Sequence, residues 1–166
     1  MKLAPCYAVI LALASSSAWA AAPGTPTPPS RIDTTSHPTD PIKVIEIFDT
    51  LISQHRAQEA LDRFIAPNVI EHDPTVEGGN RAGLYKYMKE HGWQPNSAPN
   101  PDLRDVIDRR FASGPFVVTM HHIFRTKEDR GTVFVDVFRV VDGKIVEHWD
   151  VAQGVPATNN NPYPMW

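Results

Sequence analysis

The chain has 166 residues, which is enough for one ordinary domain but not for two compact ones. Hydrophobic residues make up 42% of the sequence and charged residues 21%, so a core can form and a wholly disordered chain is excluded. The formal net charge of -3 provides no basic surface for nucleic acid or anionic lipid, so we expect neither as a partner.

The N-terminal segment 1–20 has the pattern of a secretory signal peptide. Lys2 is followed by the apolar stretch 3–14 and by the small-residue motif AWA at 18–20, with cleavage expected after this motif. The apolar stretch is too short for a spanning helix, although an uncleaved anchor is the alternative. Cys6, the single cysteine, lies inside this segment, so the mature protein would have no thiol for catalysis, metal binding or a disulfide. We expect export to the periplasm or the medium.

Proline-rich segments flank the domain. Residues 21–39 contain small and hydroxyl residues with almost nothing apolar to bury, which indicates a semi-extended tether. The domain itself is expected at 40–161, and a short C-terminal tail at 162–166. This tail carries large apolar side chains, which we expect to dock on the domain or on a partner; they are Tyr163, Met165 and Trp166.

Helical patterns dominate the first half of the domain. Asp40 can cap a helix that begins at Pro41, because its carboxylate accepts from free backbone amides. One face of this helix is apolar: Ile42, Ile45, Phe48, Leu51 and Ile52. Two further helices are expected at 57–65 and 81–91, with a short strand at 69–73 between them.

The second half of the domain is rich in β-strand patterns. After a loop at 94–101, strands are expected at 103–110, 116–124, 132–141 and 144–152. Asp142-Gly143 predicts a tight hairpin, and a longer polar loop at 127–131 closes the preceding one. The order predicts an α+β domain in which three helices cover a curved antiparallel sheet and enclose a pocket for a small molecule.

Asp136 is the strongest candidate for chemistry. It lies within the strand sequence VFVDVF at 133–138, so it has apolar neighbours on either side. An ionised carboxylate without a partner in such a place is costly, and it usually acquires a partner or a raised pKa. Asp136 is therefore a candidate acid or base, and a structural ion pair with an arginine on a neighbouring strand is the alternative.

The expected hairpin register supplies partners for Asp136. If Thr126 pairs with Thr132, His122 lies directly opposite Asp136, whereas a slip of one residue would bring in His121 instead. An imidazole opposite a buried carboxylate forms a workable proton-transfer pair. With the Asp142-Gly143 turn, one face would hold the catalytic pair together with candidate substrate-binding side chains; this set is Asp136, His122, Trp149, Met120 and Glu147.

Two further polar groups are weaker candidates. His72, at the end of the first strand, can project into a pocket mouth and bind substrate, or it can cap the next turn together with Asp73. His148 and Asp150 share the face opposite Trp149 in a regular strand, where we favour a surface or interface pair.

Other kinds of site find little support. His121 and His122 are adjacent on a strand and point to opposite faces, and no HExxH spacing exists, so we expect no metal centre. A serine-hydrolase elbow is absent from the sequence. Gly78-Gly79 lacks the strand-to-helix context of a phosphate-binding loop.

Two sequence runs resemble a known family. The run IEHDP at 70–74 and the run VDVFRVVDGKIVEHWDVAQ at 135–153 resemble the SnoaL-like polyketide cyclases of the nuclear transport factor 2-like superfamily, in particular a bacterial branch of SnoaL-like aldol-condensation enzymes. The resemblance covers roughly residues 40–161.

This resemblance implies a cone-shaped α+β barrel with a deep pocket, often dimeric through the outer face of the sheet. Related cyclases close a ring by an intramolecular aldol step without metal or organic cofactor, using an aspartate on a strand as acid and base. Asp136 matches that aspartate, His122 matches a pocket histidine, and His72 matches a polar residue at the rim.

The sequence thus predicts an exported, cofactor-free enzyme that acts next to a carbonyl group of a hydrophobic small molecule, by aldol condensation, cyclisation or isomerisation. A catalytically inert ligand-binding or dimerisation module of the same fold is the alternative, because this fold supports several functions. The apolar positions Val135, Val137 and Val141, on the face away from Asp136, favour a homodimer.

Overall fold

Three helices begin close to where the sequence predicts them. The computed structural model describes residues 32–91 and 101–166, so the expected signal peptide and most of the expected tether and of the 94–101 loop lie outside the described residues. Helix α1 (Pro41–Ser53) is capped by the Asp40 carboxylate, as expected. Helices α2 (Ala57–Phe64) and α3 (Arg81–Glu90) follow, and a short 3₁₀ turn η1 (Glu77–Gly79) precedes α3.

Five strands form one sheet in the order β1-β5-β4-β3-β2. Their bounds are Ile65–Glu71 for β1, Arg104–Ser113 for β2, Phe116–Phe124 for β3, Thr132–Val141 for β4 and Lys144–Gly154 for β5. Strands β2 to β5 form the expected antiparallel meander, but β1 pairs parallel to β5. The sheet is therefore mixed rather than wholly antiparallel, because β1 starts beside the start of β5, with Ile65 opposite Ile145.

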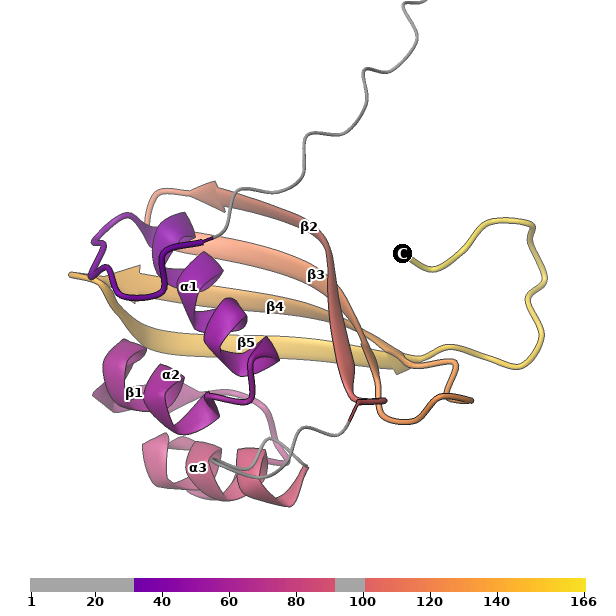
Figure 1. The fold of residues 1–166 in the computed structure, drawn as a ribbon, viewed down its shortest axis with the longest axis horizontal. Coiled ribbons are helices and arrows are strands. Elements are labelled where there is room, and N and C mark those ends of the chain that lie inside the picture. The colour runs from indigo at the N-terminus through magenta and orange to yellow at the C-terminus, as the bar shows by residue number, and fades with distance from the viewer. Residues whose placement is uncertain (1–31, 92–100) are drawn as a thin grey trace, which may run out of the picture. The chain divides into compact units, whose positions relative to one another are not determined.

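The core lies between the helices and one face of this sheet. Helix α1 packs across β2, β3 and β4 (Figure 1). Its apolar face and that of α2 meet the inner sides of the strands, and the most buried of these side chains are Ile45, Leu51, Phe64, Val117, Phe138 and Ile145. The helices thus cover one face of the sheet, which is called the inner face, and the opposite face is the outer face.

The β3–β4 hairpin has a different register from the expected one. Thr119, not His122, lies opposite Asp136, and His122 lies opposite Val133. The pairing shifts because the connection folds on itself: the Asp129 carboxylate accepts hydrogen bonds from the amides of Arg125 and Gly131. These residues therefore form a capped turn instead of extending the ladder, and an odd shift exchanges the two faces.

A bulge changes the β4–β5 pairing in the same way. The Asp142-Gly143 turn forms as predicted, with positive φ at both residues. The register then shifts between Arg139 and Val140, so that Asp136 lies opposite Asp150 and not opposite Trp149. The bulge adds one residue to β5, which reverses the expected facing of the rest of that strand.

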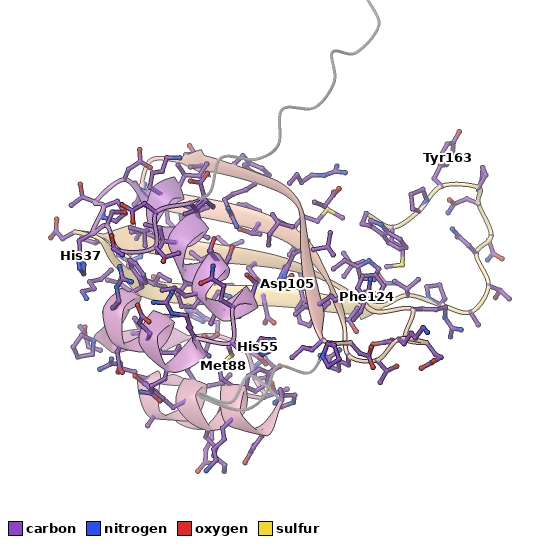
Figure 2. All side chains as sticks on the ribbon, in the orientation of Figure 1. His37, His55, Met88, Asp105, Phe124 and Tyr163 are labelled. Carbon is purple, nitrogen blue, oxygen red and sulfur yellow. The ribbon has the colours of Figure 1, made fainter. Side chains whose placement is uncertain are left out.

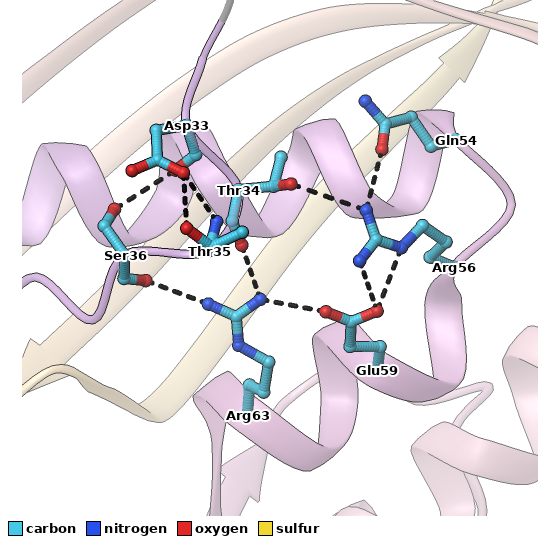
Figure 3. A network of polar contacts seen from close by, with 8 residues as sticks. All are labelled: Asp33, Thr34, Thr35, Ser36, Gln54, Arg56, Glu59 and Arg63. Carbon is cyan, nitrogen blue, oxygen red and sulfur yellow. Dashed lines mark hydrogen bonds and ion pairs between the residues drawn. The ribbon is translucent and has the colours of Figure 1, made fainter.

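The two ends of the described chain lie against the domain in different ways. Arg63 on α2 donates hydrogen bonds to the backbone oxygens of Thr34 and Ser36, within the polar network shown in Figure 3. At the other end, the Trp166 ring contacts the His122 ring at 4.3 Å, as expected for a docked tail. Tyr163 is 73% exposed and points away from the sheet (Figure 2). Among the described residues no helix is long and apolar enough to cross a membrane.

Candidate functional site

A cavity lies between the inner face of the sheet and the helices. It has a volume of about 130 Å³, and all three helices and every strand contribute to its wall. Most of the wall is apolar, including Phe48, Ile52, Leu61, Met88, Phe134 and Phe138. Asp136 lines this cavity, with 14% of its side chain exposed. The expected hollow beside this carboxylate is therefore present.

Two histidines flank the Asp136 carboxylate. The Nε2 atom of His121 lies 3.0 Å from Asp136 Oδ2, and the Nε2 atom of His148 lies 3.9 Å from Asp136 Oδ1. Both rings also line the cavity. They reach Asp136 from the neighbouring strands on either side, because the observed registers place His121 and His148 on the inner face.

The other ring nitrogen of each histidine, Nδ1, contacts a second carboxylate. Asp105 Oδ1 accepts a hydrogen bond from Nδ1 of His121 at 2.7 Å, and Glu71 Oε2 accepts one from Nδ1 of His148 at 2.8 Å. The Glu71 side chain is fully buried, and its other oxygen accepts from the amide of Asp73. These bonds orient both rings so that each Nε2 faces Asp136.

The five groups alternate in charge, which sets their protonation. Burial opposes the charged form of both rings, but the carboxylates outweigh it and raise the pKa of His121 and of His148 to about 10. Burial also opposes ionisation of Asp136, but the two imidazoles outweigh it and lower its pKa to about 2. At neutral pH the cavity therefore presents an ionised carboxylate between two imidazolium cations.

The imidazole groups retain donors for a ligand. Neither Nε2 atom, of His121 or of His148, makes a hydrogen bond of good geometry within the described residues, although both are buried. Their contacts with Asp136, at 3.0 Å and 3.9 Å, are ion pairs and not hydrogen bonds. A ligand oxygen in the cavity can therefore accept hydrogen bonds from these N–H groups without breaking an existing hydrogen bond.

A second group of polar side chains lines another part of the cavity wall. Asp150 on β5, Asp73 after β1 and Tyr87 on α3 all belong to the lining. Burial, reinforced by the Asp73 carboxylate, raises the pKa of Asp150 to about 6. Burial likewise raises the pKa of the Tyr87 hydroxyl. This part of the wall is acidic.

The expected pair of Asp136 with His122 does not form. His122 is buried on the face away from the cavity, where its Nε2 atom lies 2.9 Å from the backbone oxygen of Arg130. Phe124 and Trp166 pack against its ring. The three-residue shift of the β3–β4 register is the cause: His121 lies opposite Phe134 and reaches Asp136 diagonally, not from the directly opposite position that a one-residue slip predicts.

The other expected binding residues also lie on the outer face. His72 stacks on Trp149 with ring centroids 4.6 Å apart, and its Nε2 atom lies 3.0 Å from Glu147 Oε1. Glu147 also accepts from Arg139. Met120 lies opposite Val135 and shares this face. The bulge in β5 places Trp149 and Glu147 outside, and none of these residues lines the cavity.

Four residues of the site were missed or undervalued in the sequence. His148 and Asp150 were expected to form a surface or interface pair, yet both line the cavity. Glu71 has part of the signal of Asp136, since it follows the apolar pair Val69-Ile70 in a strand but precedes the polar His72, and this partial signal could have found it. Asp105 carried no local signal, because only its pairing opposite Ile123 places it beside His121.

The arrangement is suited to moving protons. Within residues 32–91 and 101–166, no three of the histidine, cysteine, aspartate and glutamate side chains gather in a geometry that could hold a metal ion. The alternating chain of carboxylates and imidazoles instead combines a proton acceptor with cationic donors in a largely apolar cavity.

Part of the sequence matches a known protein family. Residues 44–148 match the sequence profile of the family described as "SnoaL-like domain". No curated protein matches the chain with significance.

Several solved structures share the fold. IdmH from Streptomyces antibioticus, a "putative polyketide cyclase", is 20% identical with a TM-score of 0.51, over 68% of this chain and 91% of that one. A "putative ketosteroid isomerase" from Kribbella flavida is 18% identical with a TM-score of 0.53, over 71% and 81%. A "putative polyketide cyclase" from Acidithiobacillus ferrooxidans is 22% identical with a TM-score of 0.51, over 66% and 85%. Similarity at this level of identity shows a common fold.

Proposed function

Because the chain belongs to the SnoaL-like domain family, we propose that it is a small-molecule enzyme that removes and returns a proton next to a carbonyl group. The names of its structural neighbours, which include cyclases and an isomerase, support this class of reaction. The observation that carries the proposal is the Asp136 carboxylate between two imidazolium groups on the wall of an apolar cavity.

Asp136 is the base of the proposed reaction. Its pKa of about 2 keeps it ionised at neutral pH, so it is ready to accept a proton from carbon. Such a low pKa makes it a weak base while both imidazolium groups pair with it. Basicity rises when the substrate draws those donors away, because their attraction is what lowers the pKa.

His121 and His148 stabilise the product of that step. Removal of the proton places negative charge on the carbonyl oxygen of the substrate. The two Nε2–H groups are positively charged donors without a good hydrogen-bond acceptor, so they suit this oxyanion better than the neutral ketone. The resulting enolate either attacks a second carbonyl of the same molecule or is reprotonated at another carbon, and every step uses side chains of the chain itself.

The lining indicates a hydrophobic substrate. The surface of the wall is mainly apolar, with phenylalanine, isoleucine, leucine and methionine side chains contributing to it, and most of the titratable groups lie on the strands. A ketone with an apolar or aromatic body fits both parts of this wall, with its carbonyl group directed to the sheet. We therefore propose a hydrophobic carbonyl compound as the ligand class.

Hydrogen–deuterium exchange tests the proposal without knowledge of the natural substrate. A panel of aromatic ketones and 1,3-diketones is incubated with the protein in D₂O, and loss of the proton next to the carbonyl is followed by NMR. We expect Asp136→Asn to slow the exchange of the best panel member about 100-fold or more, the usual range of general acid–base catalysis. Full exchange by a folded Asp136→Asn protein contradicts the assignment.

A matched control uses the neighbouring histidines. His121→Gln should slow exchange at least 10-fold because it removes a cationic donor, whereas Met120→Leu, on the outer face, should leave it unchanged. If wild type binds panel ketones, read as a rise in Tm, but exchanges none of them, the alternative of a catalytically inert binding module is correct.

We also propose that the outer face of the sheet forms a homodimer. Large apolar side chains are exposed there on all five strands; they are Ile70, Val106, Phe111, Phe116, Val141 and Val151. An exposed apolar set of this extent favours a protein interface. Sedimentation at micromolar concentration should give a dimer, and Val151→Glu a monomer; a wild-type monomer rules out this interface.

Export is a further proposal, supported by the signal-like pattern of segment 1–20. Expression of the full chain in a Gram-negative host should give a protein in the periplasm or medium that begins at residue 21. Full-length protein retained in the cytoplasm contradicts export.

A further inference from the structure

Asp150 is the cross-strand neighbour of Asp136. The two residues lie directly opposite each other on β5 and β4, and both line the cavity. Residues paired in this way have Cβ atoms about 5 Å apart and side chains on the same face. A substrate that reaches the Asp136 carboxylate therefore also reaches Asp150.

The two carboxylates differ in their partners. Asp136 has an ion pair with each flanking imidazole. The Asp150 side chain makes no hydrogen bond or ion pair with any of the described residues. Its side chain is half-buried, and it faces the cavity without a cation in contact. This leaves Asp150 free to exchange a proton with a ligand.

The groups around Asp150 come from several elements. Asp73 and Glu71 face it from β1 and the turn that follows, and Asp136 faces it from β4; all three disfavour its negative charge. His148, on the same strand as Asp150, favours the negative charge of Asp150. The Asp150 charge in turn disfavours ionisation of the Tyr87 hydroxyl on α3. Arg125 also lines this cavity. Burial and Asp73 dominate, and they raise the pKa of Asp150 to about 6.

The two neighbouring carboxylates are thus suited to different roles, Asp136 as a base and Asp150 as an acid. The environment holds Asp136 ionised, while Asp150 carries a proton in part of the molecules near neutral pH. Pairs of titratable groups whose surroundings separate their pKa values divide the roles of base and acid between them.

We propose that Asp150 is a second proton-transferring residue of this cavity, which donates a proton to the substrate oxygen after Asp136 has taken one from carbon. The inference rests on the proposed function and adds a residue to it. In an aldol-type reaction, Asp136 takes the proton and the electron pair of the C–H bond remains as an enolate. The enolate carbon then forms a C–C bond to a second carbonyl carbon, whose oxygen becomes an alkoxide and takes the proton of Asp150.

The cycle closes within the pair. Asp136 is now protonated and Asp150 is ionised, so transfer of one proton from the first carboxyl to the second, directly or through one water, restores the starting state. Atoms and charge balance, and no oxidant, reductant or further reactant is needed.

The first test separates the two proton transfers. Panel diketones that carry both carbonyls in one molecule are followed by NMR for exchange of the proton next to the carbonyl and for the cyclised product. Asp150→Asn should slow product formation at least 10-fold more than it slows exchange, whereas Asp136→Asn should slow both together. Asp108→Asn, an exposed aspartate outside the cavity wall, is the matched control and should change neither.

The second test needs no turnover. Carboxyl carbons labelled with ¹³C report the titration of Asp150 by NMR, with the signal assigned from its loss in Asp150→Asn. We expect a midpoint near pH 6, and a lower midpoint in Asp73→Asn, where a repelling charge is removed. A midpoint near the ordinary aspartate value of about 3.9 overturns the inference, because the group would then hold no proton to donate.

The outcomes distinguish this inference from the function beneath it. If exchange requires Asp136 but product formation ignores Asp150, the inference alone fails. If wild type exchanges no panel ketone, the proposed function fails and the inference fails with it. Equal loss of exchange and product in Asp150→Asn also contradicts a separate second transfer, since it indicates a structural role.

Discussion

The inner and the outer face of the sheet each carry a pair of histidine and glutamate, and the two pairs behave differently. On the inner face, Glu71 is fully buried and holds His148, whose side chain is 16% exposed. On the outer face, Glu147 holds His72, whose side chain is 39% exposed. The nitrogen–oxygen distances are similar, at 2.8 and 3.0 Å.

The difference shows that the surroundings decide what a pair does. Inside, low dielectric strengthens the attraction, so the pKa of His148 rises to about 10. Outside, water and salt screen the charges, and the His72 ring also stacks on Trp149. A glutamate and a histidine therefore form a buried charged pair on the inner face and a solvent-screened contact on the outer face.

The largest expected effect comes from breaking each pair in turn. Glu71→Gln leaves the buried His148 cation without the nearer of its two carboxylates, and should lower the free energy of unfolding by about 3 kcal/mol. Glu147→Gln should lower it by much less, because the His72 and Arg139 side chains that pair with Glu147 are partly exposed and solvent screens their charges. Urea unfolding at pH 7 checks both. Equal losses in the two variants would show that burial does not separate the faces.

The pH dependence of stability sharpens the comparison. The folded pKa of His121 and of His148, about 10, lies above the unfolded value of about 6.5, so their contribution is complete below pH 6.5 and is lost as pH rises toward 10. We expect the free energy of unfolding to fall as the pH rises from 6.5 to 10. His148→Gln should reduce this decline and His72→Gln should not. A flat profile in wild type would contradict the charged state of the inner histidines.

The smallest expected effect is a gain in stability. The folded pKa of Asp150, about 6, lies above its unfolded value, so its favourable contribution is present below about pH 3.9 and is lost as pH rises through 6. Above pH 7 the ionised side chain therefore destabilises the fold, and Asp150→Asn should raise Tm by about 1 to 3 °C. At pH 3.5 the gain should vanish. A loss of stability at pH 8 would show that Asp150 has a structural partner.

Local patterns predicted most of the secondary structure. The strands at 116–124 and 132–141 have the predicted bounds, and the helix capped by Asp40 begins where expected. These elements depend on alternation, capping and turn residues, all of which act over a few positions. The first strand was placed late, because its start Ile65 follows α2 directly, without a separating turn.

The candidate site was predicted in part. Asp136 was found because a carboxylate within an apolar strand is costly wherever that strand lies, and this reasoning needs no register. The predicted histidine partner of Asp136 was His122, but the observed one is the adjacent His121. The strand pairing that decides this is set by a capped turn at 125–131 and a bulge after Arg139. Neither irregularity has a strong sequence signal.

The sequence by itself determined the elements, the α+β class and the one strand carboxylate that needs a partner, because these follow from side-chain polarity at neighbouring positions. Only the tertiary structure decided which histidines meet Asp136, and it brought Glu71, Asp105 and Asp150 to the same cavity from three different strands. The physical reason is the two-residue period of a strand: an odd shift in pairing moves every side chain to the opposite face, and that shift is set by contacts between distant segments.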